Sequence, residues 1–510
     1  MKDVTTFHQG AGGVALRRVR AARAMCLSLA VILSSGILST GTVTQVARAQ
    51  FSTETKLTAS DASVGSRFGQ SVGLSGNTAI IGAHSDDDAA AGAGAAYLFD
   101  VGTGNELFKL LASDAAASDS FGWSVAISGN AAIVGAPFDD DAGGGSGSAY
   151  LFDVFTGNQL FKPTASDAAE RDSFGWSVAI NDGMAIVGAP FDDDAGNTSG
   201  SAYLFDVGTG SELFKLTASD AAASDSFGWS VAISGNTAIV GALRNNAAYL
   251  FDVTTGNELF KLTAGDAAGG ESFGGSVAIS GNIAIVGAEA DSDAGTGSGS
   301  AYLYNVATGK ELFKLTASDA AAFDKFGISV AISDGVAIVG AEGAAENSGS
   351  AYAFDVATGN QILKPTASDT ALSDRFGRSV AISGSAALIG ANGNDDGAGF
   401  ESGSAYLFAS TSLTSDLTGN GFVDFEDLTV LLANWNQQVG SELGNLVDPT
   451  NTPVNFEDLT VLLAGWTGPG PAGAPEAALA AVSVPEPSGL MLAVAGLCGM
   501  GCWRRRRART

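Results

Sequence analysis

The chain has 510 residues, 45% of them hydrophobic and only 15% charged, which excludes intrinsic disorder and, at this length, requires a large repeat domain or several domains. Segment 50–503 carries 14 basic against 53 acidic residues, a net charge of −39, and so acidic a surface excludes a nucleic-acid partner. The cysteines, Cys26, Cys498 and Cys502, fall in the two terminal apolar segments, so the body has neither a disulfide nor a thiolate metal site.

Residues 1–49 have the three parts of a secretory signal peptide. A basic region that contains Arg17 and Arg18 precedes an apolar run over 24–38. Ala47 and Ala49 then provide the small residues of a cleavage site before position 50. We therefore predict export, with cleavage after Ala49.

Seven similar units follow over 50–410, and each contains a Phe-Gly pair. Their phenylalanines are Phe68, Phe121, Phe174, Phe227, Phe273, Phe326 and Phe376. Each unit has four short runs of strand character, which in the second unit are 121–128, 131–136, 147–154 and 159–166. Short strands separated by Gly, Asn and Asp at regular intervals are typical of radial β-architecture. We predict an all-β seven-bladed β-propeller.

Side-chain size along the strands fits blades around an axis. The first strand of a unit alternates Val and Ile with Ser and Ala, which suits a crowded centre. The third and fourth strands carry bulky residues such as Tyr150, Phe152, Leu160 and Phe161. We expect these to pack between blades at the wider periphery.

The count of outer strands predicts how the ring closes. A Lys-x-x-Ala segment marks the fourth strand, and its lysines are Lys56, Lys109, Lys162, Lys215, Lys261, Lys314 and Lys364. One copy precedes the first Phe-Gly, and none follows the last third strand at 403–408. The strand around 51–60 should therefore complete the seventh blade, so that the ring needs no caps.

Phe-Gly, followed by Gly-Ala-Pro at 135–137 and 188–190, resembles the FG-GAP repeats of integrin α-subunit propellers and of many bacterial surface proteins. The resemblance covers about 51–410 and implies a seven-bladed propeller with a role in adhesion or ligand display. Integrin-type repeats hold calcium in an Asp-rich loop between the first and second strands. Here that connection is a tight turn such as 181–183, so we do not expect this calcium cage.

Acidic clusters lie in two other connections. Those between second and third strands are Asp86, Asp87, Asp88, Asp139, Asp140, Asp141, Asp192, Asp193 and Asp194. A second set, between fourth and first strands, includes Asp114 and Asp167. Because antiparallel strands reverse direction each time, both sets should emerge on one face. Two interpretations remain open: a cation-assisted ligand face, or solvated loops that keep the edges soluble.

Enzyme signatures are missing, so we expect no catalytic activity. The mature body has one histidine, His84, in an acidic loop, and no phosphate-binding glycine motif. Catalysis by a pair of carboxylates stays open, because aspartates are numerous. Trp123, Trp176 and Trp229 follow Phe-Gly in three consecutive units, where they could either stack on sugars or pack between blades.

A small α-helical domain is predicted over 411–467. Its first loop has the spacing of an EF-hand-type calcium site, with ligands Asp416, Thr418, Asn420, Phe422 (through its carbonyl), Asp424 and Asp427. A second loop–helix copy has Val447 and Pro449 at the first ligand positions, so we expect no ion there. The pair resembles a dockerin. Phe425 and Glu426 differ from the small hydroxyl residues frequent in cohesin-binding dockerins, which argues against a cohesin partner.

A Pro-, Gly- and Ala-rich linker over 468–483 leads to the C-terminal segment 484–510. That segment contains Pro485, Glu486 and Pro487, an apolar stretch over 488–503 that we predict to be a membrane segment, and four consecutive arginines. It resembles the PEP-CTERM sorting signal of Gram-negative-type bacteria. The resemblance implies processing by an exosortase after transient anchoring in the inner membrane.

These features predict an exported protein of the cell surface or extracellular matrix that binds a carbohydrate or protein ligand without turnover. Two alternatives remain. One is a secreted polysaccharide hydrolase or lyase on a propeller scaffold, and the other is a structural component of the envelope.

Overall fold

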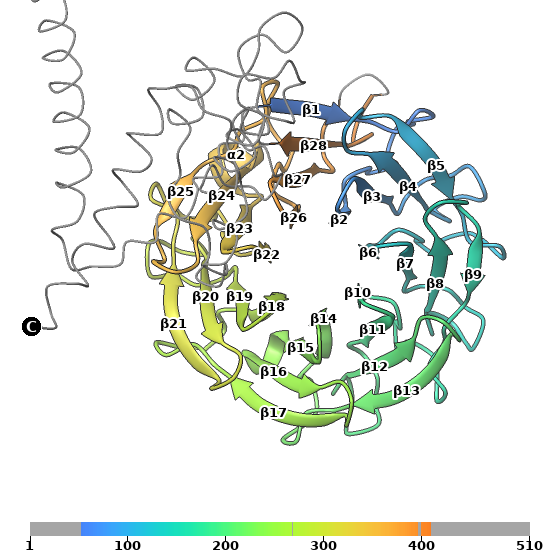
Figure 1. The fold of residues 1–510 in the computed structure, drawn as a ribbon, viewed down its shortest axis with the longest axis horizontal. Coiled ribbons are helices and arrows are strands. Elements are labelled where there is room, and N and C mark those ends of the chain that lie inside the picture. The colour runs from blue at the N-terminus through green and yellow to red at the C-terminus, as the bar shows by residue number, and fades with distance from the viewer. Residues whose placement is uncertain (1–52, 268, 396–398, 410–510) are drawn as a thin grey trace, which may run out of the picture. The chain divides into compact units, whose positions relative to one another are not determined.

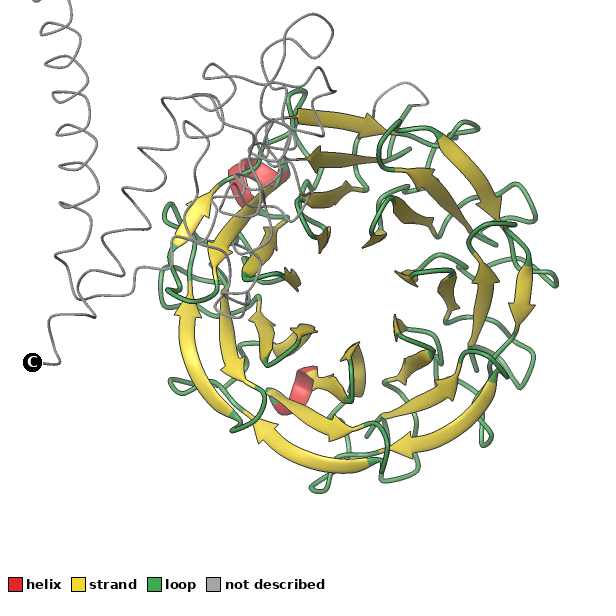
Figure 2. Ribbon diagram, in the orientation of Figure 1, coloured by secondary structure: helices red, strands yellow, loops and turns green. Residues whose placement is uncertain are grey.

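The computed structural model describes residues 53–409, apart from 268 and 396–398. Their strands form seven four-stranded antiparallel sheets arranged as blades around a common axis (Figure 1). Strands joined by loops make up nearly all of this part, with only two very short helices (Figure 2). The predicted all-β seven-bladed propeller is confirmed.

The innermost strands are β2 (Ser71–Ser75), β6 (Ser124–Ser128), β10 (Ser177–Asn181), β14 (Phe227–Ser234), β18 (Phe273–Ser280), β22 (Ser329–Ser333) and β26 (Ser379–Ser383). The second strands are β3 (Thr78–Ala83), β7 (Ala131–Ala136), β11 (Met184–Ala189), β15 (Thr237–Ala242), β19 (Ile283–Ala288), β23 (Val336–Ala341) and β27 (Ala386–Ala391). The third strands are β4 (Ala95–Asp100), β8 (Ser148–Asp153), β12 (Ser201–Asp206), β16 (Ala247–Asp252), β20 (Ser300–Asn305), β24 (Ser350–Asp355) and β28 (Ser404–Ala409). The outer strands are β5 (Glu106–Leu110), β9 (Gln159–Phe161), β13 (Ser211–Leu216), β17 (Asn257–Leu262), β21 (Lys310–Leu315), β25 (Gln361–Leu363) and β1 (Thr53–Leu57).

We number the blades along the chain, so that blade 1 contains β2 to β5 and blade 7 contains β26 to β28 together with β1. Blades 2 to 6 each contain the four consecutive strands between these. The short helices η1 (Leu243–Asn245) and α2 (Ala344–Asn347) lie in the connections between the second and third strands of blades 4 and 6.

The ring is closed by its first strand. β1 pairs antiparallel with β28, with Thr53 opposite Ala409 (Figure 1). Glu54 in β1 also accepts a hydrogen bond from the Ser368 hydroxyl at the exit of blade 6, at 2.8 Å. The predicted closure is therefore confirmed, and β28 is covered by β1 in the way that each other third strand is covered by its outer strand.

The hydrophobic core lies between neighbouring blades. At one junction Leu98 and Leu110 of blade 1 pack with Phe121, Val134 and Phe152 of blade 2. Equivalent clusters fill the other six junctions of the described ring. Each blade is thus stabilised by burying both of its faces against its neighbours.

The Phe-Gly and Gly-Ala pairs explain how closely the blades approach. Phe121 is fully buried, with its ring edge-on to Tyr150 at 5.4 Å. At Gly122, where φ is +87°, a Cβ would lie 2.2 Å from the carbonyl oxygen of Ala95 in blade 1. At Gly135 a Cβ would lie 2.0 Å from the Phe-Gly carbonyl of blade 3. Only glycine fits at these two positions, because a backbone stands where a side chain would be.

Two strand boundaries of blade 2 differ from the sequence prediction. The innermost strand begins at Ser124 rather than Phe121, and Phe121 forms an isolated parallel bridge with Gly94 of blade 1. The outer strand ends at Phe161 rather than 166, because Pro163 has no N–H to donate to the ladder. β25, which is followed by the same Lys-Pro pair, is equally short.

The prediction that bulky side chains of the third and fourth strands pack between blades is confirmed for the third strand, but only in part for the fourth. Tyr150 and Phe152 in β8 are buried, whereas Leu160 in β9 is 46% exposed. The prediction for Leu160 was wrong, because neighbouring blades diverge away from the axis and leave one side-chain row of the outer strand uncovered. Leu213 and Leu259 are exposed in the same way.

The connections between first and second strands have two residues in all seven described blades. In blade 3, Asp182 and Gly183 both have positive φ, as a tight hairpin turn requires. These connections therefore have no room for an integrin-type calcium cage, as predicted.

Candidate functional site

Both acidic sets lie at one end of the blades, which we call the loop face. It is formed by the connections between second and third strands and by those that lead from each outer strand into the next blade. Three groups of carboxylates meet there: Asp61, Asp86 and Asp88; Asp114, Asp139 and Asp141; and Asp167, Asp192 and Asp194. In each group one oxygen of every carboxylate lies within 4.8 Å of the others, so the group could hold a metal ion.

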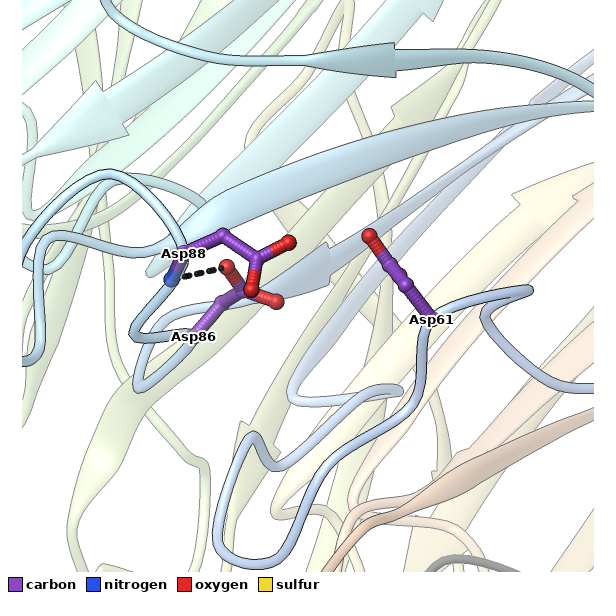
Figure 3. A group of neighbouring side chains, drawn as sticks. All are labelled: Asp61, Asp86 and Asp88. Carbon is purple, nitrogen blue, oxygen red and sulfur yellow. Dashed lines mark hydrogen bonds between the residues drawn. The ribbon is translucent and has the colours of Figure 1, made fainter.

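In the group of blade 1, Asp61 approaches Asp86 and Asp88 from a different connection (Figure 3). The Nζ atom of Lys109, on β5, lies 2.7 Å from Asp61 Oδ2, 3.2 Å from Asp86 Oδ1 and 2.6 Å from Asp88 Oδ2. An ammonium group therefore already lies among the three carboxylates. A divalent cation would have to displace it.

Tyr97 forms the floor of this group. Its buried hydroxyl lies 2.8 Å from Asp61 Oδ1 and 3.0 Å from Asp86 Oδ2, and the Nζ of Lys109 lies 5.3 Å from its ring centroid. Burial, and then the charge of Asp86, raise the pKa of Tyr97 far above its usual range, so the hydroxyl stays a donor. Burial alone would raise the pKa of Asp61, but hydrogen bonds from Lys109 and Tyr97 lower it. Asp61 therefore stays ionised.

The same arrangement recurs around the ring. Complete sets occur in blade 2 (Asp114, Asp139, Asp141, Tyr150, Lys162), blade 3 (Asp167, Asp192, Asp194, Tyr203, Lys215) and blade 5 (Asp266, Asp291, Asp293, Tyr302, Lys314). In the remaining blades Lys261, Lys364 and Lys56 pair with Asp220, Asp319 and Asp369. All seven repeat lysines are thus ion-paired, and we call these groups the lysine clusters.

The middle aspartate of each predicted triplet stabilises its own loop. Asp87, Asp140 and Asp193 are exposed and accept backbone hydrogen bonds from residues five positions on, at 2.6 to 2.7 Å. All nine aspartates of the predicted acidic face therefore have partners within the protein. These partners favour the structural interpretation, and ligand binding by this face stays a prediction.

Several predicted sites lie outside the described residues. These are the calcium ligands Asp416, Thr418, Asn420, Phe422, Asp424 and Asp427, the cleavage site at Ala47 and Ala49, and the sorting motif Pro485, Glu486 and Pro487.

A different kind of site surrounds the axis on the loop face. There the residue after Phe-Gly changes from blade to blade: Gln70, Trp123, Trp176, Trp229, Gly275, Ile328 and Arg378. All seven line one cavity of about 320 Å³. A second cavity of about 320 Å³ shares Gln70, Trp123 and Arg378 with it. We call the two together the channel mouth.

One side of the channel mouth is aromatic. Trp176 lies between Trp123 and Trp229, with ring centroids 4.9 Å apart in both pairs. Phe138 and Phe191 pack edge-on against this row. The three tryptophans are only half-buried. They therefore pack across blades, as one of the two interpretations expected, and they also line the cavity, where stacking on a sugar stays a prediction.

The opposite side is charged. Arg67, Lys325 and Arg375 precede Phe-Gly in blades 1, 6 and 7, where the other four blades have serine. Glu342 lies 2.9 Å from Lys325 Nζ and 3.3 Å from Arg378 Nη1. Burial alone would raise the pKa of Glu342, but Arg378 and Lys325 hold it below its usual value. These residues make a partly neutralised cationic patch.

Two buried polar groups at the charged side lack partners within the described structure. His84 is 5% exposed and Asn392 is 3% exposed, and neither His84 Nδ1 nor Asn392 Oδ1 has a hydrogen-bond partner. Burial, together with Arg67 and Arg378, lowers the pKa of His84 to about 4, so its ring is neutral at neutral pH. Asn392 Oδ1 is therefore an unused acceptor that lines the cavity, and His84 Nδ1 is a second one in the tautomer that carries its proton on Nε2.

Sequence reasoning identified the tryptophans but missed the charged side. The missing signal was in the repeats themselves: once the units are aligned on Phe-Gly, basic residues replace serine before it in three of them. Blades 6, 7 and 1 are neighbours once the ring closes, so this substitution pattern, combined with the predicted closure, would have placed the three basic residues on one side of the axis.

Comparison with known proteins supports this architecture. Within the described residues, no helix is long and apolar enough to span a membrane. No curated protein matches the chain. The family model of the FG-GAP repeat matches seven segments: 51–99, 105–152, 158–205, 211–251, 257–304, 310–354 and 360–408. Each segment contains the outer strand of one blade and the first three strands of the next. Together the segments cover more than half of the chain, so the protein belongs to the FG-GAP repeat family.

Proposed function

We propose that this chain is an exported binding protein that holds an extracellular carbohydrate or protein ligand at the channel mouth, without turnover. The observation that carries the proposal is the contrast between repeated and varied positions. The strands and lysine clusters repeat around the ring, whereas the residue after Phe-Gly is Gln, Trp, Trp, Trp, Gly, Ile and Arg. Varied side chains that meet in one concave place are what a ligand site on a repeated scaffold requires.

The scaffold is suited to this role. The ring is closed by β1, and every blade buries both faces, so the channel mouth is held by rigid elements and is largely preformed. FG-GAP repeat proteins are usually extracellular or surface-exposed. Together these points support binding or adhesion outside the cell.

The test is a binding screen of the purified full chain against arrays of glycans and of extracellular proteins. We expect at least one class of ligand to bind, and the Trp123→Ala variant to bind it more weakly. Retention of the same ligand by Trp123→Ala would place the site elsewhere. Absence of binding in both arrays would favour a structural envelope role instead.

One observation favours a second candidate function, the cleavage of a polysaccharide. Glu289 and Glu342 both line the cavity that carries the tryptophans. Burial raises the pKa of Glu289, whereas the pKa of Glu342 is lowered against the effect of burial by Arg378 and Lys325. Carboxylates with oppositely shifted pKa values can act as acid and base. Release of reducing ends that is abolished in Glu289→Gln would establish this function and refute simple binding.

Export and sorting are part of the proposal. The signal peptide over 1–49 and the PEP-CTERM-like segment 484–510 support delivery to the surface or matrix of a Gram-negative-type bacterium, with an exosortase as processing partner. Deletion of 484–510 should change the processed mass, or shift the protein from the envelope to the medium. Identical fractionation and mass with and without this segment would contradict the sorting role.

We also propose one calcium ion in the dockerin-like loop that begins at Asp416. Two neutral side-chain ligands, and Asp rather than Glu at the twelfth position, predict a dissociation constant of roughly 10⁻⁵ to 10⁻³ M. Calorimetry of the full chain should give one site that is lost in Asp416→Ala. Binding that survives Asp416→Ala would refute the assignment.

A further inference from the structure

We propose that the ligand of the channel mouth is an anionic saccharide, a sugar ring that carries a carboxylate or a sulfate. This inference rests on the proposed function and narrows its ligand class. Three features of the channel mouth carry it: the cationic patch, the aromatic row and the two unused acceptors.

The cationic patch indicates that the ligand carries a negative charge. Of the 14 basic residues in 50–503, seven are the repeat lysines and are ion-paired in the lysine clusters. Four of the other seven, Arg67, Lys325, Arg375 and Arg378, line a single cavity. This concentration of positive charge stands out in a segment whose net charge is −39. An anion approaching elsewhere on the loop face meets carboxylates, so the charge distribution directs it to this cavity.

Part of this charge remains available to a ligand. Glu342 is shared between Lys325 and Arg378, and Glu401 pairs with Arg67 at 2.9 Å. Within the described residues, Arg375 has no ion-paired partner. Four cations against two paired carboxylates leave the cavity able to accept a further negative group. A guanidinium is well suited to a carboxylate or sulfate, because it donates two parallel hydrogen bonds.

The aromatic row indicates that the ligand contains a sugar ring and is not an inorganic anion alone. Trp123 lines both cavities, and Trp176 and Trp229 extend the row along one of them. A half-buried indole offers a flat apolar surface for the C–H face of a sugar. Each cavity of about 320 Å³ lies at the small end of ligand pockets, which suits the last few rings of a chain better than a folded protein surface.

The unused acceptors indicate that the ligand carries hydroxyl groups, which can donate hydrogen bonds to them. His84 Nδ1 and Asn392 Oδ1 are buried and unpartnered, and both residues line the cavity that contains the four cations. A buried acceptor without a donor is unfavourable. A sulfate or chloride ion offers no donors to these atoms, whereas sugar hydroxyls do. A hydroxylated ring with one negative substituent is the chemistry that satisfies all three features together.

The decisive test compares two ligands of the same shape. Calorimetry of the full chain should be carried out with trigalacturonic acid and with its methyl ester, which keeps the rings and removes the charge. We expect the acid to bind at least about tenfold more tightly than the ester. A sulfated galactose oligosaccharide in a third arm shows whether the natural charge is a carboxylate or a sulfate.

Two variants locate the site. Arg378→Gln should weaken the acid at least about tenfold and leave the ester nearly unchanged. Lys310→Gln is the matched control, since it removes one exposed positive charge from β21, away from the cavity, and should leave both affinities unchanged. Thermal melting of each variant confirms that it is folded.

The remaining outcomes overturn the inference in distinguishable ways. Equal binding of acid and ester, or an acid affinity that Arg378→Gln does not change, refutes the anionic class while leaving a carbohydrate-binding function intact. Tight binding of an acidic peptide in place of the sugars refutes the saccharide and retains a protein ligand. If no sugar binds but the protein arrays give a ligand, the inference fails and the proposed function stands.

Discussion

The lysine clusters and the channel mouth lie on the same loop face but use charge in opposite ways. In the lysine clusters, carboxylates surround a lysine supplied by the same blade, as Asp61, Asp86 and Asp88 surround Lys109. At the channel mouth, Arg67, Lys325, Arg375 and Arg378 converge from three blades, and only part of their charge is neutralised.

The difference teaches where function can reside in a repeat protein. A group that recurs in most blades, with each acid paired to a base or a backbone N–H, contributes to the stability of every blade. A group assembled from positions that differ between blades is not required by the repeat, so these positions are free to recognise a ligand. The predictions below test this division, beginning with the largest expected effect.

Removal of β1 would disrupt both regions at once. A mature chain that begins at residue 61 loses the pairing of β1 with β28, the buried Leu57 and the ion pair between Lys56 and Asp369. We expect its unfolding temperature to fall by about 10 °C or more, or the protein to aggregate through the exposed strand edge. The matched control begins at residue 50. Identical melting curves for the two chains would contradict ring closure.

Replacement of a repeat lysine should damage stability more than replacement of an exposed one. The Lys162→Met variant removes the cation from Asp114, Asp139 and Asp141. We expect the uncompensated charge in this half-buried cluster to lower the free energy of unfolding by about 2–3 kcal/mol. Lys310→Met, at an exposed position of β21, should change it by less than about 0.5 kcal/mol. Chemical denaturation measures both.

The same variant tests the lysine as a built-in cation. Without the ammonium, the three carboxylates of Lys162→Met can bind a divalent ion, so millimolar calcium should restore part of the lost stability. Loss of stability with no rescue by calcium would mean that the cluster lacks the geometry of a cation site.

Acid should destabilise the channel mouth through His84. Its pKa is lowered by burial and then by Arg67 and Arg378, from 6.5 to about 4. The unfolded chain therefore binds the proton more readily between these values, and stability falls as the pH drops from 6.5 to 4, by up to about 3 kcal/mol. The difference in unfolding free energy between wild type and His84→Gln, followed across this range, isolates the effect. A pH-independent difference would show that His84 titrates normally.

The smallest effect is expected from a chelator. Because lysine ammonium groups already lie among the carboxylates, EDTA should shift the unfolding temperature of the wild-type propeller by less than about 1 °C. A large shift, reversed by calcium, would show that a metal ion rather than lysine neutralises these clusters.

The sequence alone determined the architecture of this protein. Seven Phe-Gly pairs, four strand-like runs per unit and an outer-strand lysine ahead of the first unit were sufficient to predict seven blades and closure by β1, and both predictions are confirmed. These two predictions succeed because the same pattern of strands and turns occurs in seven units, so each unit confirms the interpretation of the others. The boundaries were less exact: β6 begins at Ser124 and β14 at Phe227, although the repeat pattern is the same in both units.

The tertiary structure decided the chemistry of the loop face. The sequence displayed acidic loops, but only the folded ring shows that Lys109, from a different strand, lies among their carboxylates. In the same way, Arg67 and Arg375 lie near opposite ends of the propeller sequence and meet at one cavity because blade 7 closes against blade 1. Local patterns determine strands and turns, whereas a site built by ring closure joins residues that no local pattern relates.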